Sequence, residues 1–267
     1  PEEAIAAANE VLRSGRLHRY NTAPGETAEA ALLEAEYAAY QGAKYCLACT
    51  SGGATMAFAL RAADVAPSEA VLTIAFTLAP VPGAIAAVGA RPVFVETTDN
   101  LTIDLDDLAA KAQTSGASVL LLSHMRGHLV DMEALAKALA DHNITLIEDC
   151  AHTMGATWNG KKSGNFGLAG CFSTQTYKHM NSGEGGFMTS DDPAFMARAI
   201  MLSGSYMLYA RHGAAPPAEA FADARLNTPN MSARMDNLRA SILRPQLRTL
   251  DDAIARWHTR YQAVAAV

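Results

Sequence analysis

The chain has 267 residues, of which 50% are hydrophobic and 18% are charged, and its formal net charge is −6. This balance predicts a folded α/β or similar globular protein with a sizeable core and excludes a disordered chain. The negative charge argues against nucleic acid as a partner, because phosphate backbones are bound through basic surfaces, whereas a small anionic ligand needs only local donors.

The N-terminal part of the chain is predicted to form two helices joined by an arm. Residues 2–14 have the amphipathic spacing of a helix that ends at the glycine after it, and they do not resemble a signal peptide. The arm, residues 16–25, is rich in polar side chains. A second helix is expected over residues 28–40, with Thr27 as its N-cap.

Four cysteines are present, and two of them, Cys46 and Cys49, form a C-x-x-C pair. The residues around them predict a strand over residues 45–49, and residues three apart on a strand point to opposite faces. A second pair at zinc-finger spacing is missing from the sequence. We therefore expect buried free cysteines, no metal site and a cytoplasmic protein.

The turn after this strand is a candidate anion site. The polar and small residues Ser51, Gly52, Gly53 and Ala54 lead into an apolar helix that runs to residue 63. Free backbone N–H groups and the helix dipole point at one spot in such a turn. An ordinary glycine turn is the alternative. The lysine segment described below favours phosphate binding.

Residues 70–90 contain no charged side chain, and the stretch is long enough to be checked as a membrane span. It is rich in Ala, Gly and Pro and poor in Leu and Phe. A strand over residues 71–74, a turn and a buried helix explain it better, so we expect no membrane partner.

Strands and helices alternate through the first half of the chain, with further strands at 92–95, 119–124 and 144–149. This alternation indicates a mostly parallel, doubly wound sheet. Ligands of such sheets bind beyond the carboxyl ends of the strands. Four residues fall at such ends and are expected around one pocket: Ser51, Phe76, His124 and Asp149.

Two segments contain the parts that pyridoxal 5′-phosphate chemistry needs. One strand ends in the acidic pair Glu148–Asp149, and the polar segment 172–186 carries a single lysine, Lys178, before a Gly-rich turn. A lysine amine forms a Schiff base with the cofactor aldehyde, and a carboxylate keeps the pyridine nitrogen protonated. Strand alternation favours Asp149 over Glu148. The lysines in 159–162 are expected on an exposed turn.

The C-terminal third is predicted to be mostly helical. Helices are expected at 193–202, at 231–243 with Pro245 as a stop, and at 250–266, with an irregular stretch at 205–224.

The order of these segments resembles the DegT/DnrJ/EryC1/StrS family, the sugar aminotransferase branch of fold-type-I enzymes. The resemblance runs from about residue 21 to residue 250. It rests on Glu148 to His152, Gly164 to Gly167, Phe172–Ser173, Lys178, Gly183 to Gly186 and Arg234 to Ala240. It implies an α/β fold: a large cofactor-binding domain with a mostly parallel sheet flanked by helices, plus the start of a smaller C-terminal domain. The expected divisions are 1–25 for an N-terminal helix and arm, 26–225 for the large domain, and 226–267 for an incomplete small domain.

The resemblance also implies roles for individual residues. Lys178 and Asp149 become the catalytic pair, and Ser173 binds the phosphate. Phe76 stacks on the pyridine ring, with a core phenylalanine at a strand end as the alternative. His152 lies over the ring or bonds its O3′, although a satisfied core histidine is an equal alternative. This chain has Gly53 where the family usually has Thr, so backbone donors of Gly52 to Ala54, or the hydroxyls of Ser51 and Thr55, must bind the phosphate.

The resemblance further implies a homodimer with shared active sites. In this family an Asn shortly before the Arg-Met segment reaches the partner's cofactor phosphate. Direct counting places Ser232 there, and a shift of two residues selects Asn230. A helix N-cap at Asn230 or Ser232 is the alternative.

The implied activity is an aminotransferase running a ping-pong exchange with pyridoxal 5′-phosphate. Glutamate or glutamine is the expected amino donor, and a keto sugar, nucleotide-linked keto sugar or cyclitol is the expected acceptor. Two alternatives stay open. One is a sugar dehydratase of the same family, in which a histidine replaces the lysine; His179 beside Lys178 makes this worth testing. The other is a non-catalytic, ligand-sensing homologue.

Overall fold

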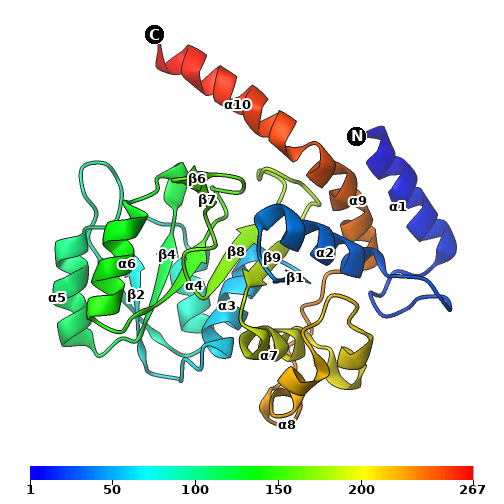
Figure 1. The fold of residues 1–267 in the computed structure, drawn as a ribbon, viewed down its shortest axis with the longest axis horizontal. Coiled ribbons are helices and arrows are strands. Elements are labelled where there is room, and N and C mark those ends of the chain that lie inside the picture. The colour runs from blue at the N-terminus through cyan, green and yellow to red at the C-terminus, as the bar shows by residue number, and fades with distance from the viewer. Residues whose placement is uncertain (267) are drawn as a thin grey trace.

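A seven-stranded sheet with the strand order β1-β9-β8-β5-β4-β2-β3 forms the centre of the fold (Figure 1). The computed structural model describes residues 1–266. The strands are β1 (Tyr45–Cys49), β2 (Ala70–Ile74), β3 (Arg91–Val95), β4 (Val119–Ser123), β5 (Thr145–Asp149), β8 (Ala169–Ser173) and β9 (Gly186–Ser190). Within this sheet β9 alone runs antiparallel to its neighbours β1 and β8. The predicted mostly parallel α/β sheet is confirmed.

Helices cover both faces of the sheet. One face packs on α3 (Gly52–Ala62), α4 (Pro80–Ala87) and α7 (Pro193–Ser203), and the other on α2 (Glu29–Gln41), α5 (Leu105–Ser115) and α6 (Met132–Asp141). Successive residues of a strand enter opposite clusters: Ile147 packs with α3, whereas Leu146 packs on the side of α5 and α6. Burial on both faces explains the near-continuous apolar strands.

Helices from the two terminal regions of the described chain pack together (Figure 1). Helix α1 (Glu2–Ser14) packs against α9 (Asn237–Arg248), and α10 (Leu250–Ala265) extends away from the body of the fold. The shorter elements are η1 (Met125–Gly127), β6 (Thr157–Trp158), β7 (Lys161–Lys162), η2 (Tyr206–Arg211), η3 (Ala218–Phe221) and α8 (Ala224–Asn227).

Several local predictions are confirmed. Helix α1 ends at Ser14, and Gly15 follows it in the left-handed conformation. Cys46 and Cys49 are free, and they enter different core clusters on opposite faces of the sheet. The uncharged stretch 70–90 contains β2, a turn and α4, and none of the helices in residues 1–266 has the length and apolar character of a membrane span.

The predicted N-cap of α2 is wrong. The helix begins at Glu29 with Ala28 at the N-cap, where no side chain accepts a hydrogen bond from the first turn. Instead the N–H of Ala30 donates to Oδ1 of Asn237 at 3.2 Å. Asn237 also donates to the carbonyls of Arg16 and His18. A residue of α9 therefore provides hydrogen-bond partners for the backbone at the start of α2 and in the arm.

The predicted helix 231–243 is also wrong in its bounds. Residues 233–235 run alongside β1, because Thr50 donates to the Ala233 carbonyl and Met235 donates to the Ala48 carbonyl. Asp236 caps the true helix by accepting the Arg239 N–H at 2.8 Å. Pro245 lies inside α9 and does not stop it. The predicted domain divisions at residues 25 and 225 stay predictions.

Candidate active site

A cavity of about 370 Å³ lies beyond the carboxyl ends of β4, β5 and β8, at the start of α3. Its size is within the range of about 300–1,000 Å³ that is typical of small-molecule sites. Six of the predicted site residues line it: Gly52, Gly53, Asp149, His152, Ser173 and Lys178. Other polar side chains in its wall are those of Ser51, Ser123, Gln175 and Glu184.

Asp149 is the acid of the pair that faces this cavity. It ends β5, is 8% exposed, and accepts hydrogen bonds from Ser123 Oγ at 2.7 Å and from the Ala151 N–H at 3.1 Å. These donors hold the carboxylate in one orientation. The structure therefore agrees with the choice of Asp149 that strand alternation favoured.

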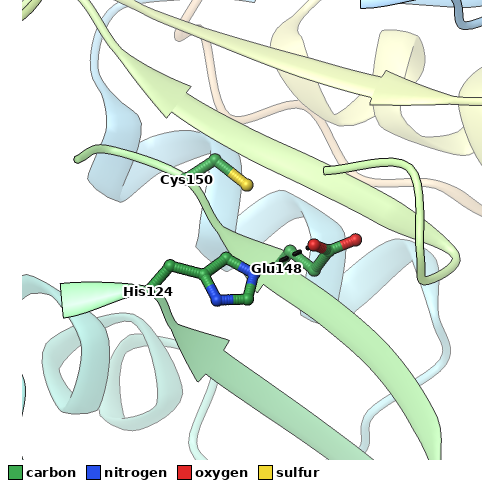
Figure 2. Close-up of side chains that lie close together, drawn as sticks. All are labelled: His124, Glu148 and Cys150. Atoms are coloured by element: carbon green, nitrogen blue, oxygen red, sulfur yellow. Dashed lines mark hydrogen bonds and ion pairs between the residues drawn. The ribbon is translucent and has the colours of Figure 1, made fainter. Parts of the chain in front are cut away.

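Glu148 is fully buried on the opposite face of β5 (Figure 2). Its carboxylate accepts a hydrogen bond from His124 Nε2 at 2.9 Å, if that nitrogen carries the ring proton. It also accepts the backbone N–H groups of Gly164, Phe166 and Gly167 at 2.7–3.0 Å. The acid therefore fixes the Gly164–Gly167 loop under the end of β5.

His124, Glu148 and Cys150 together form a buried group of potential metal ligands, with ligand atoms within 4.8 Å of one another (Figure 2). Both Glu148 oxygens are already engaged by four donors. Burial raises the pKa of Cys150 well above its usual value, which keeps the thiol protonated, whereas metals bind the thiolate. These contacts fit a buried hydrogen-bonded cluster with a structural role better than a metal centre.

Lys178 is carried by the loop between β8 and β9. Thr174 donates to the Gly185 carbonyl at 2.9 Å, and Ser182 donates to the Thr174 carbonyl at 3.0 Å, so the base of the loop is closed. Gln246 of α9 braces its far side, because it exchanges two hydrogen bonds of 2.8 Å with the backbone of Asn181. The lysine therefore projects from a loop that is tied by hydrogen bonds at its base and on its far side.

The lysine amine contacts His152, and the backbone decides which ring nitrogen carries the proton. His152 Nδ1 accepts the N–H of Arg126 at 3.0 Å, so the neutral ring carries its proton on Nε2. Nε2 lies 2.8 Å from Lys178 Nζ. The contact is a hydrogen bond when the ring donates and the lysine is a neutral amine.

Burial shifts both groups of this pair toward the neutral state. It lowers the pKa of Lys178, whereas the negative charge of Asp149 opposes this effect and the positive charge of Arg126 adds to it. Burial also lowers the pKa of His152, with additional lowering by Lys178 and Arg126. A lysine with a lowered pKa is the better nucleophile and base.

The start of α3 has donors for an anion. Ser51 caps the helix by accepting the Ala54 N–H at 3.0 Å, so Ala54 is already engaged. Thr55 donates its hydroxyl to the Gly52 carbonyl and is buried. Within residues 1–266 the N–H groups of Gly52 and Gly53 have no acceptor. These two N–H groups, with Ser173 opposite, suit a phosphate.

Glycine is required where β9 begins against this turn. A Cβ on Gly186 would lie 2.6 Å from the backbone nitrogen of Gly52 and 2.7 Å from the carbonyl oxygen of Phe172. No side chain fits at these distances, so the Gly-rich end of the lysine loop lets β9 approach the phosphate-binding turn.

Besides Ala54, three predicted residues lie outside this cavity. His124 points to the opposite face with Glu148, and the prediction that it joins the pocket is wrong. Phe76 packs, partly buried, beside the α5–α6 cluster, and the cavity wall contains Leu78 and Met125 instead. Asn230 is exposed and donates to Ser232 Oγ at 3.0 Å, away from the cavity of its own chain. The cofactor roles of Phe76 and Asn230 stay predictions.

Sequence reasoning missed Ser123 and Arg126. Ser123 shares its strand face with Leu121, which packs against α3, so alternation alone could have identified it. Arg126 has a positive φ of 57°, and no local sequence signal indicated this turn.

These groups fit pyridoxal 5′-phosphate, with free N–H donors for the phosphate, a carboxylate for the pyridine nitrogen, and a lysine of lowered pKa for the aldehyde. The sequence profile of the DegT/DnrJ/EryC1/StrS aminotransferase family matches residues 1–266.

Individual relatives agree with this match. A pleiotropic regulatory protein of Geobacillus stearothermophilus and 3-amino-5-hydroxybenzoate synthase of Amycolatopsis mediterranei are each 34% identical over 88% of this chain. A dTDP-3-amino-3,4,6-trideoxy-alpha-D-glucose transaminase of Micromonospora megalomicea is 33% identical over 84%. The chain spans 59%, 60% and 57% of the lengths of these three proteins.

Solved structures of related enzymes match the fold of this chain. The crystal structure of 3-amino-5-hydroxybenzoic acid synthase matches with a TM-score of 0.84 and 29% identity, over 98% of this chain and 65% of the other. S. venezuelae DesV, solved in complex with a ketimine intermediate, matches with a TM-score of 0.78 and 28% identity, over 94% and 62%. The expected fold and the expected cofactor, pyridoxal 5′-phosphate, are confirmed. The chain belongs to the DegT/DnrJ/EryC1/StrS aminotransferase family.

Proposed function

We propose that this protein moves an amino group from glutamate or glutamine to a keto sugar, a nucleotide-linked keto sugar or a cyclitol by a ping-pong exchange. The observation that carries the proposal is one cavity in which Lys178, Asp149 and the amino end of α3 meet. The acceptor class rests on the names of relatives such as the dTDP-amino sugar transaminase. The cofactor, when bound, supplies an electron sink that lets the bond to an α-hydrogen break.

Each residue has a separate task in this proposal. Gly52, Gly53 and Ser173 bind the phosphate, and Asp149 holds a proton at the pyridine nitrogen. Lys178 Nζ would hold the cofactor and would serve as the base that moves the proton at the α-carbon of the substrate. His152 directs its Nε2–H toward Lys178 Nζ and so orients the amine.

The dehydratase alternative requires a histidine in place of Lys178. His179 is the neighbour that an alignment slip would select. Its ring packs edge-on against Trp257 with centroids 5.4 Å apart, and it does not line the cavity. Lys178, unlike His179, lines the cavity, which favours transamination.

A ligand-sensing protein is the second alternative, and the regulatory name of one relative gives it some support. A sensor has no need of a lysine with a lowered pKa beside an oriented acid. Both are present here.

The test is the first half-reaction. Purified protein loaded with pyridoxal 5′-phosphate is mixed with L-glutamate, L-glutamine or L-alanine, and the visible cofactor band is followed with the amount of keto acid released. One of the first two donors should bleach the band with one equivalent of keto acid per site. Lys178→Ala should abolish this, whereas Lys161→Ala, at the exposed start of β7, should not. Bound cofactor that no donor converts would favour the sensor.

We also propose a cytoplasmic homodimer with shared sites. The four cysteines are buried and free, as expected in a reducing compartment. Around Asn230 lie large exposed apolar side chains, among them Met207 at 91% and Leu226 at 74% exposure. Exposed patches of this kind mark interaction sites. The capping alternative for Asn230 does not apply, because Asp236 caps α9.

Mixing two inactive variants tests this arrangement. Lys178→Ala and Asn230→Ala subunits are combined and allowed to exchange, and exchange is verified by mass. If Asn230 acts across the interface, mixed dimers contain one intact site and activity returns. Absence of activity after verified exchange would show that Asn230 does not act in the partner's site.

A further inference from the structure

Ser123 is the last residue of β4 and lies directly beside Asp149 in the register of the sheet. Its side chain is buried, with 5% exposure, and lines the cavity. The hydroxyl donates to Asp149 Oδ2 at 2.7 Å. The backbone reinforces this position, because the His124 N–H donates to the Asp149 carbonyl oxygen at 3.0 Å.

We propose that Ser123 is a positioning residue that aims the Asp149 carboxylate at the pyridine nitrogen of the cofactor. This inference rests on the proposed function, since it assigns the partner of Asp149. Ser123 itself does not touch the reacting atoms.

The geometry explains why a hydroxyl is needed. Each carboxylate oxygen can accept about two hydrogen bonds. Ser123 takes one position on Oδ2, and the Ala151 N–H takes one on Oδ1. The remaining positions are available to a donor in the cavity, so the carboxylate is held from the protein side by two fixed donors. An apolar side chain at 123 would leave Oδ2 without its buried donor and free the carboxylate to rotate.

The hydroxyl also has no competing task. Within the described residues, Asp149 is its only hydrogen-bond acceptor. A serine hydroxyl has one proton to donate, so its donor capacity is used on Asp149. Replacing Ser123 should therefore change the protonation of the cofactor nitrogen more than the stability of the fold.

The experiment compares Ser123→Ala with Ser123→Thr, which keeps the hydroxyl. Two quantities are measured: the dissociation constant for pyridoxal 5′-phosphate by equilibrium dialysis, and the ¹⁵N chemical shift of the labelled pyridine nitrogen of the bound cofactor against pH. For Ser123→Ala we expect the dissociation constant to rise about tenfold. The pyridine nitrogen should lose its proton about one pH unit lower than in the wild type. Ser123→Thr should resemble the wild type in both.

A double-mutant cycle with Asp149→Asn isolates the route of the effect. If Ser123 acts through the Asp149 charge, Ser123→Ala should have little further effect in the Asp149→Asn background. An equal loss in both backgrounds would overturn the proposal, as would a wild-type ¹⁵N titration in Ser123→Ala.

Two controls separate the remaining outcomes. If Ser123→Ala does not fold, Ser123→Cys keeps the volume but supplies only a weak donor, and it should show the same shift. Failure of the wild type to bind the cofactor would overturn the proposed function and this inference with it. A wild type that binds, with a ¹⁵N titration unchanged in Ser123→Ala, would overturn this inference alone.

Discussion

Replacing Glu34 with Gln removes the charge at the centre of a buried network that holds the N-terminal arm to α2 and β1. Glu34 is fully buried on α2 and accepts two hydrogen bonds from Arg19, at 2.8 and 2.7 Å. It also accepts the Ala48 N–H at 2.8 Å, and it lies 3.1 Å from His212 Nε2. Arg19 is 2% exposed, so the variant leaves a buried guanidinium without its counter-charge.

The size of the effect follows from the charges. Burial raises the pKa of Glu34, but Arg19 and His212 outweigh it and lower the pKa from 4.5 to about 2. A depression of this size corresponds to roughly 3 kcal/mol. This stabilisation is present above pH 4.5 and is lost as the pH falls toward 2. Glu34→Gln should therefore lower the free energy of unfolding at pH 7 by about 3 kcal/mol.

Urea unfolding at a series of pH values from 7 downward measures this directly. The wild type should lose stability below pH 4.5 more steeply than the variant, which no longer has this titrating group. Glu26→Gln is the matched control. It breaks the exposed ion pair with Arg16 and should leave the urea concentration at the unfolding midpoint nearly unchanged. A variant within 1 kcal/mol of the wild type at pH 7 (about a third of the expected loss), or one with the same acid dependence, would refute the reasoning.

Three further outcomes are expected. Asp149→Asn should weaken cofactor binding in equilibrium dialysis by about 1.5–3 kcal/mol, the value of a hydrogen bond to a charged group, and unchanged binding would assign the role to another acid. Arg126→Met should raise the pKa of Lys178, because it removes a nearby positive charge. The amine in cofactor-free protein should then react with an acylating reagent only at higher pH. An unchanged pH midpoint of this reaction would show that the Arg126 charge does not act on Lys178. Gly186→Ala should lower both thermal stability and cofactor affinity, since its Cβ would lie 2.6 Å from the first nitrogen of α3, whereas Gly83→Ala, with open space around it, should not.

Residue alternation along strands was the most informative signal for the site. It favoured Asp149 over Glu148, and the structure places these two side chains on opposite faces of β5. The same rule applied one strand earlier would have rejected His124, which shares a face with Leu122, and selected Ser123. The error came from using only the position at a strand end. That position fixes the edge of the sheet at which a residue lies, but not the face toward which its side chain points.

Contacts between distant segments account for the boundaries that were missed. The start of α2 depends on Asn237, about 200 residues away, and no local cap signal contains that information. Helical periodicity from residue 231 was overridden because residues 233–235 pair with β1. Likewise, the tautomer of His152 depends on the backbone turn at Arg126, which only the folded chain brings within reach.

Borohydride reduction of the cofactor-loaded protein, followed by peptide mapping, tests whether Lys178 is the residue that attaches pyridoxal 5′-phosphate. The position of Lys178 in the cavity, with a lowered pKa and 2.8 Å from His152, predicts one labelled peptide, the one containing Lys178. It is the only lysine after Lys162, so the peptide is unambiguous. Label on Lys161 or Lys162, or no label on a protein that has bound the cofactor, would contradict this assignment of the active site.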